Sequence, residues 1–191
     1  MEDNTWLILI ITDEDTVGWK FNEETGLSKY ITIQNQYCLV ELLPKFCFLG
    51  VRYDGTLEKV NCINGKIEEL VDCGVQIPTD MQYMGNGMVL IASKVNNIVN
   101  VVNIRKKNVV KEFRFQETIG YIDHYSPDML IIQYFNNHQL YKFDLGEEKE
   151  EELVKLPVSV IRFGGWVYGV SNEGNTIVRS KTKKFCLGVS E

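Results

Sequence analysis

The chain has 191 residues, of which 45% are hydrophobic and 24% are charged, and its formal net charge is -6. This composition is typical of a globular protein and excludes a disordered tail. The acidic balance counts against a free-standing nucleic-acid binder, which is usually basic, although it leaves room for a local basic patch.

Residue choice favours strands over helices along the whole chain. Valine, isoleucine, tyrosine, phenylalanine and tryptophan are frequent, whereas Ala92 is the only alanine. Because alanine is the strongest helix former, and β-branched and aromatic residues favour strands, we predict an all-β protein.

The first expected strands lie in residues 5–35. The apolar segment 6–11 is followed by strand-like segments 17–21 and 27–33. Segment 6–11 is too short for the core of a signal peptide or for a membrane-spanning helix. We therefore expect a soluble, intracellular protein, cytoplasmic or nuclear, with no membrane contact.

Residues 36–76 and 79–117 each contain four expected strands separated by tight turns. Asp54-Gly55 and Asn64-Gly65 mark turns in the first stretch, and Gly85-Asn86-Gly87 and Asn96-Asn97 mark turns in the second. Such pairs favour two-residue hairpins, so each stretch is predicted to be an antiparallel meander. The expected strands are 37–43, 46–53, 56–62 and 66–73, then 81–84, 88–93, 98–104 and 109–115.

Residues 119–157 and 158–191 repeat the same order. The expected strands are 122–125, 129–135, 139–145 and 152–156, then 158–163, 166–171, 176–180 and 185–189. The second strand of a copy, such as 129–135, is apolar throughout, whereas the outer strand 152–156 is mixed. This contrast is expected when sheets stack face to face and bury their central strands.

A turn-forming segment follows the second expected strand of every copy at intervals of about 36 to 42 residues, the length of a four-stranded propeller blade. These segments are Thr12-Asp13, Asp54-Gly55, Asn96-Asn97, Asn136-Asn137 and Asn172-Glu173-Gly174. We predict a β-propeller-like array of about five blades, with a first blade that lacks its innermost strand. The repeats 5–35, 36–76, 79–117, 119–157 and 158–191 are expected to form a single domain.

The fourth copy resembles the WD40-like β-propeller repeat. Its segments Tyr125-Ser126-Pro127-Asp128, 129–135, Asn136-Asn137 and Phe143-Asp144-Leu145 follow the order of the family's FSPDG turn, strand, DG turn and WDL ending. The Gly-His start motif and the Trp-Asp pair are missing from every copy, and kelch, NHL and other propeller repeats fit almost as well. The resemblance implies a rigid scaffold that presents loops to protein partners.

Propellers of that family usually have seven blades, and this chain supplies about five. The array therefore closes as a small propeller, stays open, or is completed by a partner that donates a strand or packs on the open end. A partner is a natural expectation, because exposed strand edges promote aggregation unless something covers them.

The sequence carries no motif for catalysis or for binding a cofactor or metal. GxSxG, Walker and GxGxxG motifs are missing, and the histidine and cysteine spacing does not fit a metal site. His124 and His138 are expected at different strand ends. We therefore predict that the protein is not an enzyme and has no cofactor, metal or small-molecule substrate.

The five cysteines form no CxxC pair and lie mostly in apolar segments. This pattern indicates buried free thiols in a reducing compartment.

Charged clusters are the candidate contact sites. Two basic clusters fall on turns between third and fourth strands and could bind RNA phosphates or an acidic partner. They comprise Arg105, Lys106, Lys107 and Lys111, and Arg179, Lys181, Lys183 and Lys184. An acidic run comprising Glu147, Glu148, Glu150 and Glu151 is a candidate contact for a basic partner. The alternative for each cluster is that the charges protect the edges of outer strands.

Two functions follow from these patterns. The first is a non-catalytic protein–protein interaction scaffold, a small or incomplete propeller that acts as a subunit of a larger complex. The alternative is a ribonucleoprotein- or ribosome-associated factor that contacts RNA phosphates through its basic loops.

Overall fold

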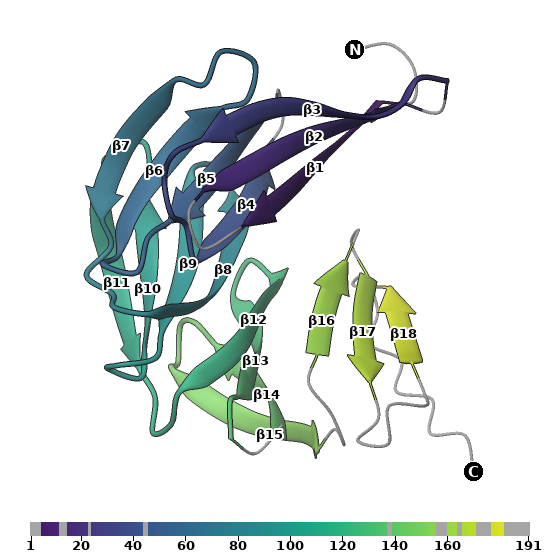
Figure 1. The fold of residues 1–191 in the computed structure, drawn as a ribbon. Coiled ribbons are helices and arrows are strands. Elements are labelled where there is room, and N and C mark those ends of the chain that lie inside the picture. The colour runs from purple at the N-terminus through teal and green to yellow at the C-terminus, as the bar shows by residue number, and fades with distance from the viewer. Residues whose placement is uncertain are drawn as a thin grey trace.

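The computed structural model describes residues 5–11, 15–22, 24–43, 46–136, 139–155, 160–163, 166–170 and 177–181. These residues form strands in five antiparallel sheets that follow one another along the chain (Figure 1). The described residues include no long apolar helix of the kind that crosses a membrane. The predicted all-β fold, a propeller-like array of antiparallel meanders, is confirmed, and the array is open.

The three middle sheets are complete four-stranded meanders, in which the strands pair in chain order. We call their strands the inner, second, third and outer strand. The second blade consists of β4 (Leu39–Leu43), β5 (Cys47–Val51), β6 (Thr56–Asn61) and β7 (Ile67–Asp72). The third consists of β8 (Pro78–Gly85), β9 (Met88–Ser93), β10 (Ile98–Asn103) and β11 (Asn108–Arg114), and the fourth of β12 (Ile119–Ser126), β13 (Met129–Tyr134), β14 (Gln139–Asp144) and β15 (Lys149–Lys155).

The first and last sheets have three strands each within the described residues. The first contains β1 (Thr5–Ile11), β2 (Thr16–Asn22) and β3 (Gly26–Ile33), and the last contains β16 (Val160–Phe163), β17 (Trp166–Val170) and β18 (Ile177–Lys181). In the repeat, β1 occupies the place of the second strands, so the described part of the first sheet has no inner strand, as predicted. The expected strand 185–189 lies outside the described residues.

The inner strands of the three complete blades lie side by side, since β8 contacts both β4 and β12. Thr79 Oγ1 donates a hydrogen bond to the carbonyl of Ile119 (2.6 Å), and the N–H of Ile122 donates to Asp80 Oδ2 (2.7 Å). β8 and β12 begin at Pro78 and Ile119, before the predicted strands 81–84 and 122–125. Figure 1 shows the five sheets along an arc that does not close.

The core lies between neighbouring blades. The second strands are its centre, and Leu49, Leu90 and Leu130 are fully buried. Between the third and fourth blades, Phe113 of β11 packs edge to face on Phe143 of β14, with ring centroids 5.2 Å apart. Each blade therefore buries one face against the next, which is the arrangement that makes single repeats depend on their neighbours.

The turn after the third strand is built in the same way in four sheets. An Asn or Asp ends the strand, and its Oδ1 accepts the N–H groups of the residues two and three positions further on, at 2.8 to 3.4 Å. These residues are Asn22, Asn61, Asn103 and Asp144. Short polar side chains favour such turns because they replace a missing backbone acceptor. Of these four residues, only Asp144 belongs to a motif recognised in the sequence, the Phe143-Asp144-Leu145 ending.

Candidate functional site

Two lysines of the first predicted basic cluster, Lys107 and Lys111, bind to neighbouring blades of the same chain. Lys107, in the turn between β10 and β11, places its Nζ 3.2 Å from Glu68 Oε1 and donates to the carbonyl of Glu69 (3.3 Å). Both acceptors belong to β7, so this lysine joins the third blade to the second. Arg105 and Lys106, in the same turn, are exposed.

Lys111 joins the third blade to the fourth. Its Nζ lies 3.0 Å from Glu148 Oε1, donates to the carbonyl of Leu145 (2.9 Å), and sits 4.5 Å from the ring centroid of Phe113. The structure therefore brings the predicted basic cluster and the predicted acidic run into direct contact with each other. This contact could not be read from spacing, because the two residues lie on different blades.

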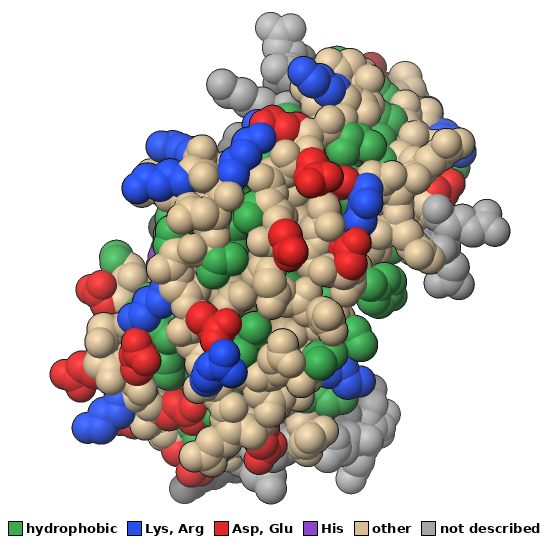
Figure 2. Space-filling view, turned by 90° about the vertical axis from the view of Figure 1, so that its left-hand side faces the viewer, with side chains coloured by type: hydrophobic (Ala, Val, Ile, Leu, Met, Phe, Trp, Pro, Cys, Tyr) green, Lys and Arg blue, Asp and Glu red, His purple; other side chains and the backbone are tan. Residues whose placement is uncertain are grey.

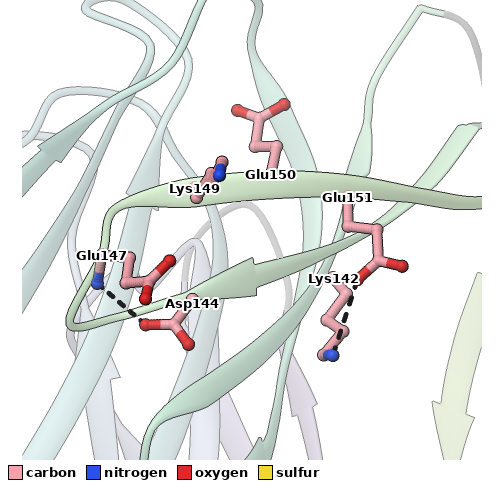
Figure 3. A pocket seen from close by; sticks show the side chains of 6 residues that line it. All are labelled: Lys142, Asp144, Glu147, Lys149, Glu150 and Glu151. Atoms are coloured by element: carbon pink, nitrogen blue, oxygen red, sulfur yellow. Dashed lines mark hydrogen bonds and ion pairs between the residues drawn. The ribbon is translucent and has the colours of Figure 1, made fainter.

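Three residues of the acidic run, Glu147, Glu150 and Glu151, line a pocket of about 360 Å³ on the hairpin of β14 and β15 (Figure 3). Lys142 pairs with Glu151 at 3.6 Å, and Asp144 Oδ1 accepts the N–H of Glu147 (2.9 Å). Backbone N–H groups of the turn hold the pKa of Asp144 below its usual value. The lining is charged throughout and comprises Lys142, Asp144, Glu147, Lys149, Glu150 and Glu151.

Glu150 belongs to a different environment from Glu151. Figure 3 shows their side chains pointing in opposite directions, as successive residues of a strand do. Glu150 accepts a hydrogen bond from the hydroxyl of Tyr134 (2.6 Å). Burial, followed by this hydrogen bond, raises the pKa of Tyr134 above its ordinary range. The predicted acidic run is thus split between two faces of one sheet.

The second predicted basic cluster and the two histidines make up the remaining candidate residues. Arg179 and Lys181 lie on β18, and Lys183, Lys184 and His138 lie outside the described residues. His124 lies on β12. Within the described part of the chain, no three His, Cys, Asp or Glu side chains are grouped to hold a metal ion. Partner contacts of the two basic clusters and the acidic run stay predictions.

Figure 2 shows the side of the molecule on which the outer strands β7 and β11 lie in Figure 1. Acidic and basic side chains alternate over this face and do not form a field of one sign. A phosphate backbone needs an extended positive surface, so this face gives no support to the RNA alternative.

A different surface lies at the end of the blades where the second strands finish. It is formed by the turns after β5, β9 and β13 and by the loops that lead into β8 and β12, and we call it the end face. Its backbone is tied together across three blades: Ile77 N–H donates to the Tyr53 carbonyl (3.0 Å), and Lys94 N–H donates to the Ile77 carbonyl (3.1 Å). Thr118 Oγ1 donates to the Lys94 carbonyl (3.3 Å) and its own carbonyl accepts the Phe135 N–H (2.8 Å).

Four large apolar side chains stand exposed on the end face, one or two from each of the three complete blades. We call them the apolar row: Tyr53 (56% exposed), Ile77 (45%), Val95 (51%) and Phe135 (54%). Lys94 Nζ lies 5.5 Å from the ring centroid of Phe135. Exposed apolar residues are unremarkable singly, whereas several on one end of the blades make that end a candidate interaction surface.

The two ends of the blades differ in chemistry. Beside the apolar row the end face presents the exposed amides Gln76, Asn96, Gln116 and Asn136, and among its described residues the exposed charges are Asp54, Lys94 and Glu117. The opposite end, at the turns between third and outer strands, carries the charged clusters described above. The end face is therefore the less charged of the two.

The apolar row is not among the sites predicted from the sequence. The predicted strands 46–53 and 129–135 include Tyr53 and Phe135, but β5 ends at Val51 and β13 at Tyr134. Both strands are therefore shorter than predicted, and the two aromatic residues lie in exposed turns. A usable signal was present, since each of them directly precedes a turn-forming pair, Asp54-Gly55 or Asn136-Asn137.

Solved structures share this fold. The WD40 β-propeller domain of Doa1 matches with a TM-score of 0.62 and 12% sequence identity, over 90% of this chain and 61% of that chain. Sqt1 of Saccharomyces cerevisiae matches with a TM-score of 0.61 and 13% identity, over 95% of this chain and 56% of that chain. The computationally designed Ika8 protein matches with a TM-score of 0.58 and 14% identity, over 91% and 57%.

The chain thus spans less than two thirds of the length of these structures. It matches no family model and none of the curated proteins. At such low identity the likeness establishes the propeller fold alone.

Proposed function

We propose that this chain is a non-catalytic protein–protein interaction scaffold, a small or incomplete propeller that acts as a subunit of a larger complex. The observation that carries the proposal is the apolar row, four exposed apolar side chains on a backbone that hydrogen bonds tie across three blades. Large apolar and aromatic side chains held rigidly are the residues that dominate binding energy in protein interfaces.

The chemistry of the end face indicates a protein segment as its occupant. Four amide side chains can pair with the backbone of a bound segment, and the apolar row can bury its side chains. Lys94 is the exposed cation of the described end face, so this surface offers little positive charge to phosphate. We therefore expect a near-neutral partner segment with apolar side chains.

An intracellular location, cytoplasmic or nuclear, belongs to this proposal. Cys38, Cys47, Cys62 and Cys73 are free thiols in the described residues. Burial raises the pKa of Cys62 to about 11 and that of Cys73 to about 12, so both are poorly reactive. Unpaired buried thiols are common where the surroundings are reducing.

The first prediction concerns the apolar row. The full chain is used to capture proteins from a lysate, which mass spectrometry identifies, and the capture is repeated with Tyr53→Ser and Phe135→Ser. Each substitution is expected to weaken the specific partner about 10-fold or more, since central aromatic contacts are worth about 2 kcal/mol each. Leu27→Ser and Ile63→Ser are matched controls, because these side chains are equally exposed but lie off the end face.

The same experiment separates the alternatives. Capture that survives Tyr53→Ser and Phe135→Ser, or that falls equally in the controls, contradicts the proposal. The RNA-associated alternative requires capture that ribonuclease abolishes, that declines steeply with salt, and that is lost in Arg105→Ala with Lys106→Ala.

A further inference from the structure

We infer that the open edge of β1 is a docking site for an extended segment of a partner protein, which adds to the first sheet as its inner strand. The inference rests on the proposed scaffold role but uses a different surface from the end face. No other described strand pairs with β1 on the edge away from β2.

The complete blades define what is missing from the first sheet. In each of them the second strand is paired on both edges, as β5 is by β4 and β6, β9 by β8 and β10, and β13 by β12 and β14. All of these pairings are antiparallel. β1 occupies the second-strand place, but among the described strands only β2 pairs with it, along its whole length from Thr5 to Ile11. The missing element is therefore an antiparallel inner strand.

The first sheet is already positioned as a blade. Leu9 of β1, with Tyr30 and Ile31 of β3, packs against the core that the second blade builds around Phe48 and Val60. This packing sets the sheet face to face with the second blade. A strand added to β1 would lie next to β4, just as β4 lies next to β8 and β8 next to β12.

The sequence of β1 argues against an edge that stays exposed. The strand reads Thr-Trp-Leu-Ile-Leu-Ile-Ile, without charge or proline. Native edge strands are usually protected by charge, proline or a bulge, because their free N–H and C=O groups recruit other strands. The pairing of β1 with β2 runs without a register shift, so no bulge twists this edge away.

The partner segment is expected to bind β1 through backbone hydrogen bonds. The inner strands β4, β8 and β12 have the sequences LVELL, PTDMQYMG and IGYIDHYS, in which apolar residues are mixed with polar ones. Main-chain hydrogen bonds supply affinity in such strand addition, and pockets for alternate side chains supply specificity. The expected segment is short and extended, with apolar residues at every second position.

The test uses the full chain and a synthetic peptide with the β12 sequence, residues 119–126, as a surrogate inner strand. Hydrogen exchange of the β1 amides that point away from β2 is measured with and without the peptide. In the free chain these amides are expected to exchange faster than those of β5, β9 and β13. At a peptide concentration about ten times Kd, their exchange should slow about tenfold, because it then proceeds through the unbound fraction.

Control peptides probe backbone pairing directly and leave the protein unchanged. N-methylation of alternate peptide residues should abolish the protection of β1 in one register and preserve it in the other, because only every second N–H of an edge strand faces its neighbour. A scrambled peptide should give no protection. Protection that both N-methylated peptides retain would show side-chain binding and overturn strand addition.

Three further outcomes would also overturn the inference. If the β1 amides exchange slowly in the free chain at every protein concentration, the chain covers this edge itself. Protection that grows with protein concentration, together with a doubled mass in sedimentation, means that a second copy covers it. Fast exchange that the peptide does not change means that β1 recruits no strand.

This result is separable from the proposed end-face docking. Tyr53→Ser and Phe135→Ser should leave the protection of β1 by the peptide intact. Failure of the end-face variants with intact β1 protection would remove the end-face proposal alone, and the opposite result would remove the strand-addition site alone.

Discussion

Glu58, on β6, is a carboxylate at the centre of a buried polar network. It is 3% exposed, and its Oε2 accepts hydrogen bonds from the Tyr37 hydroxyl (2.5 Å) and from Asn35 Nδ2 (2.7 Å). Its Oε1 pairs with Arg52 Nη2 at 2.5 Å. Burial, followed by the hydrogen bond to Glu58, raises the pKa of Tyr37 above its ordinary range. The network joins the link between the first two sheets to the centre of the second blade.

The second prediction is that Glu58→Ala lowers the free energy of unfolding by about 2 to 4 kcal/mol, because it leaves a buried hydroxyl and a guanidinium without their acceptor. Urea unfolding measures the loss. Glu68→Ala is the control, since Glu68 pairs with Lys107 at an exposed position where ion pairs contribute about 0.5 kcal/mol. Equal effects in the two variants would show that the buried network adds no stability beyond a surface pair.

The turns after the third strands share one construction in four of the described sheets. In the third blade, Asn103 Oδ1 accepts the N–H groups of Arg105 (3.0 Å) and Lys106 (2.9 Å). Lys107 then has φ 55°, a left-handed conformation that Glu148 repeats in the fourth blade and that Gly65 adopts in the second. The asparagine thus stabilises a turn in which Lys107 adopts a backbone conformation that non-glycine residues rarely take.

The third prediction is that Asn103→Ala costs about 0.5 to 1.5 kcal/mol of stability, because two turn N–H groups lose their acceptor. Thermal unfolding measures the effect. Asn108→Ala, in the same hairpin but at an exposed position of β11, is the matched control and should change stability by less than about 0.5 kcal/mol. A cost at Asn108 as large as that at Asn103 would refute the role of the side-chain acceptor.

At the scale of the whole molecule, stability comes from contacts between blades. Phe143 of the fourth blade packs against Phe113 and Phe115 of the third, with ring centroids 5.2 and 4.9 Å apart. The lysines of the third blade add ion pairs to the second and fourth blades. The core is therefore shared, and a defect in one blade should be felt in the next.

The fourth prediction is that Phe143→Ala lowers the free energy of unfolding by about 3 to 5 kcal/mol, the usual cost of removing a buried aromatic side chain. Because the ring is shared, hydrogen exchange of β11 in the third blade should accelerate as well as that of β14. Leu153→Ala, on the outer strand β15 and 40% exposed, should have a small effect confined to the fourth blade. An effect of Phe143→Ala confined to the fourth blade would refute the shared core.

Local sequence was sufficient to predict the blades. Turn pairs such as Asp54-Gly55 and Asn96-Asn97, placed after apolar strands, predict hairpins because a tight turn and its flanking strands are fixed by neighbouring residues. The short first sheet followed from the same pattern. The prediction that the repeats form a single domain, and the partner contacts of the charged clusters, stay untested.

Only the tertiary structure decided which residues meet and which stay exposed. Lys111 and Glu148 were assigned to different partners, yet they lie 3.0 Å apart because adjacent blades bring the two turns together. The predicted strands include Tyr53 and Phe135, but β5 and β13 end at Val51 and Tyr134, and the backbones of the two aromatic residues pair with Ile77 and Thr118 in the loops that lead into β8 and β12. Hairpin formation depends on residues close in sequence, whereas ion pairs, exposure and an open edge depend on how the blades stack.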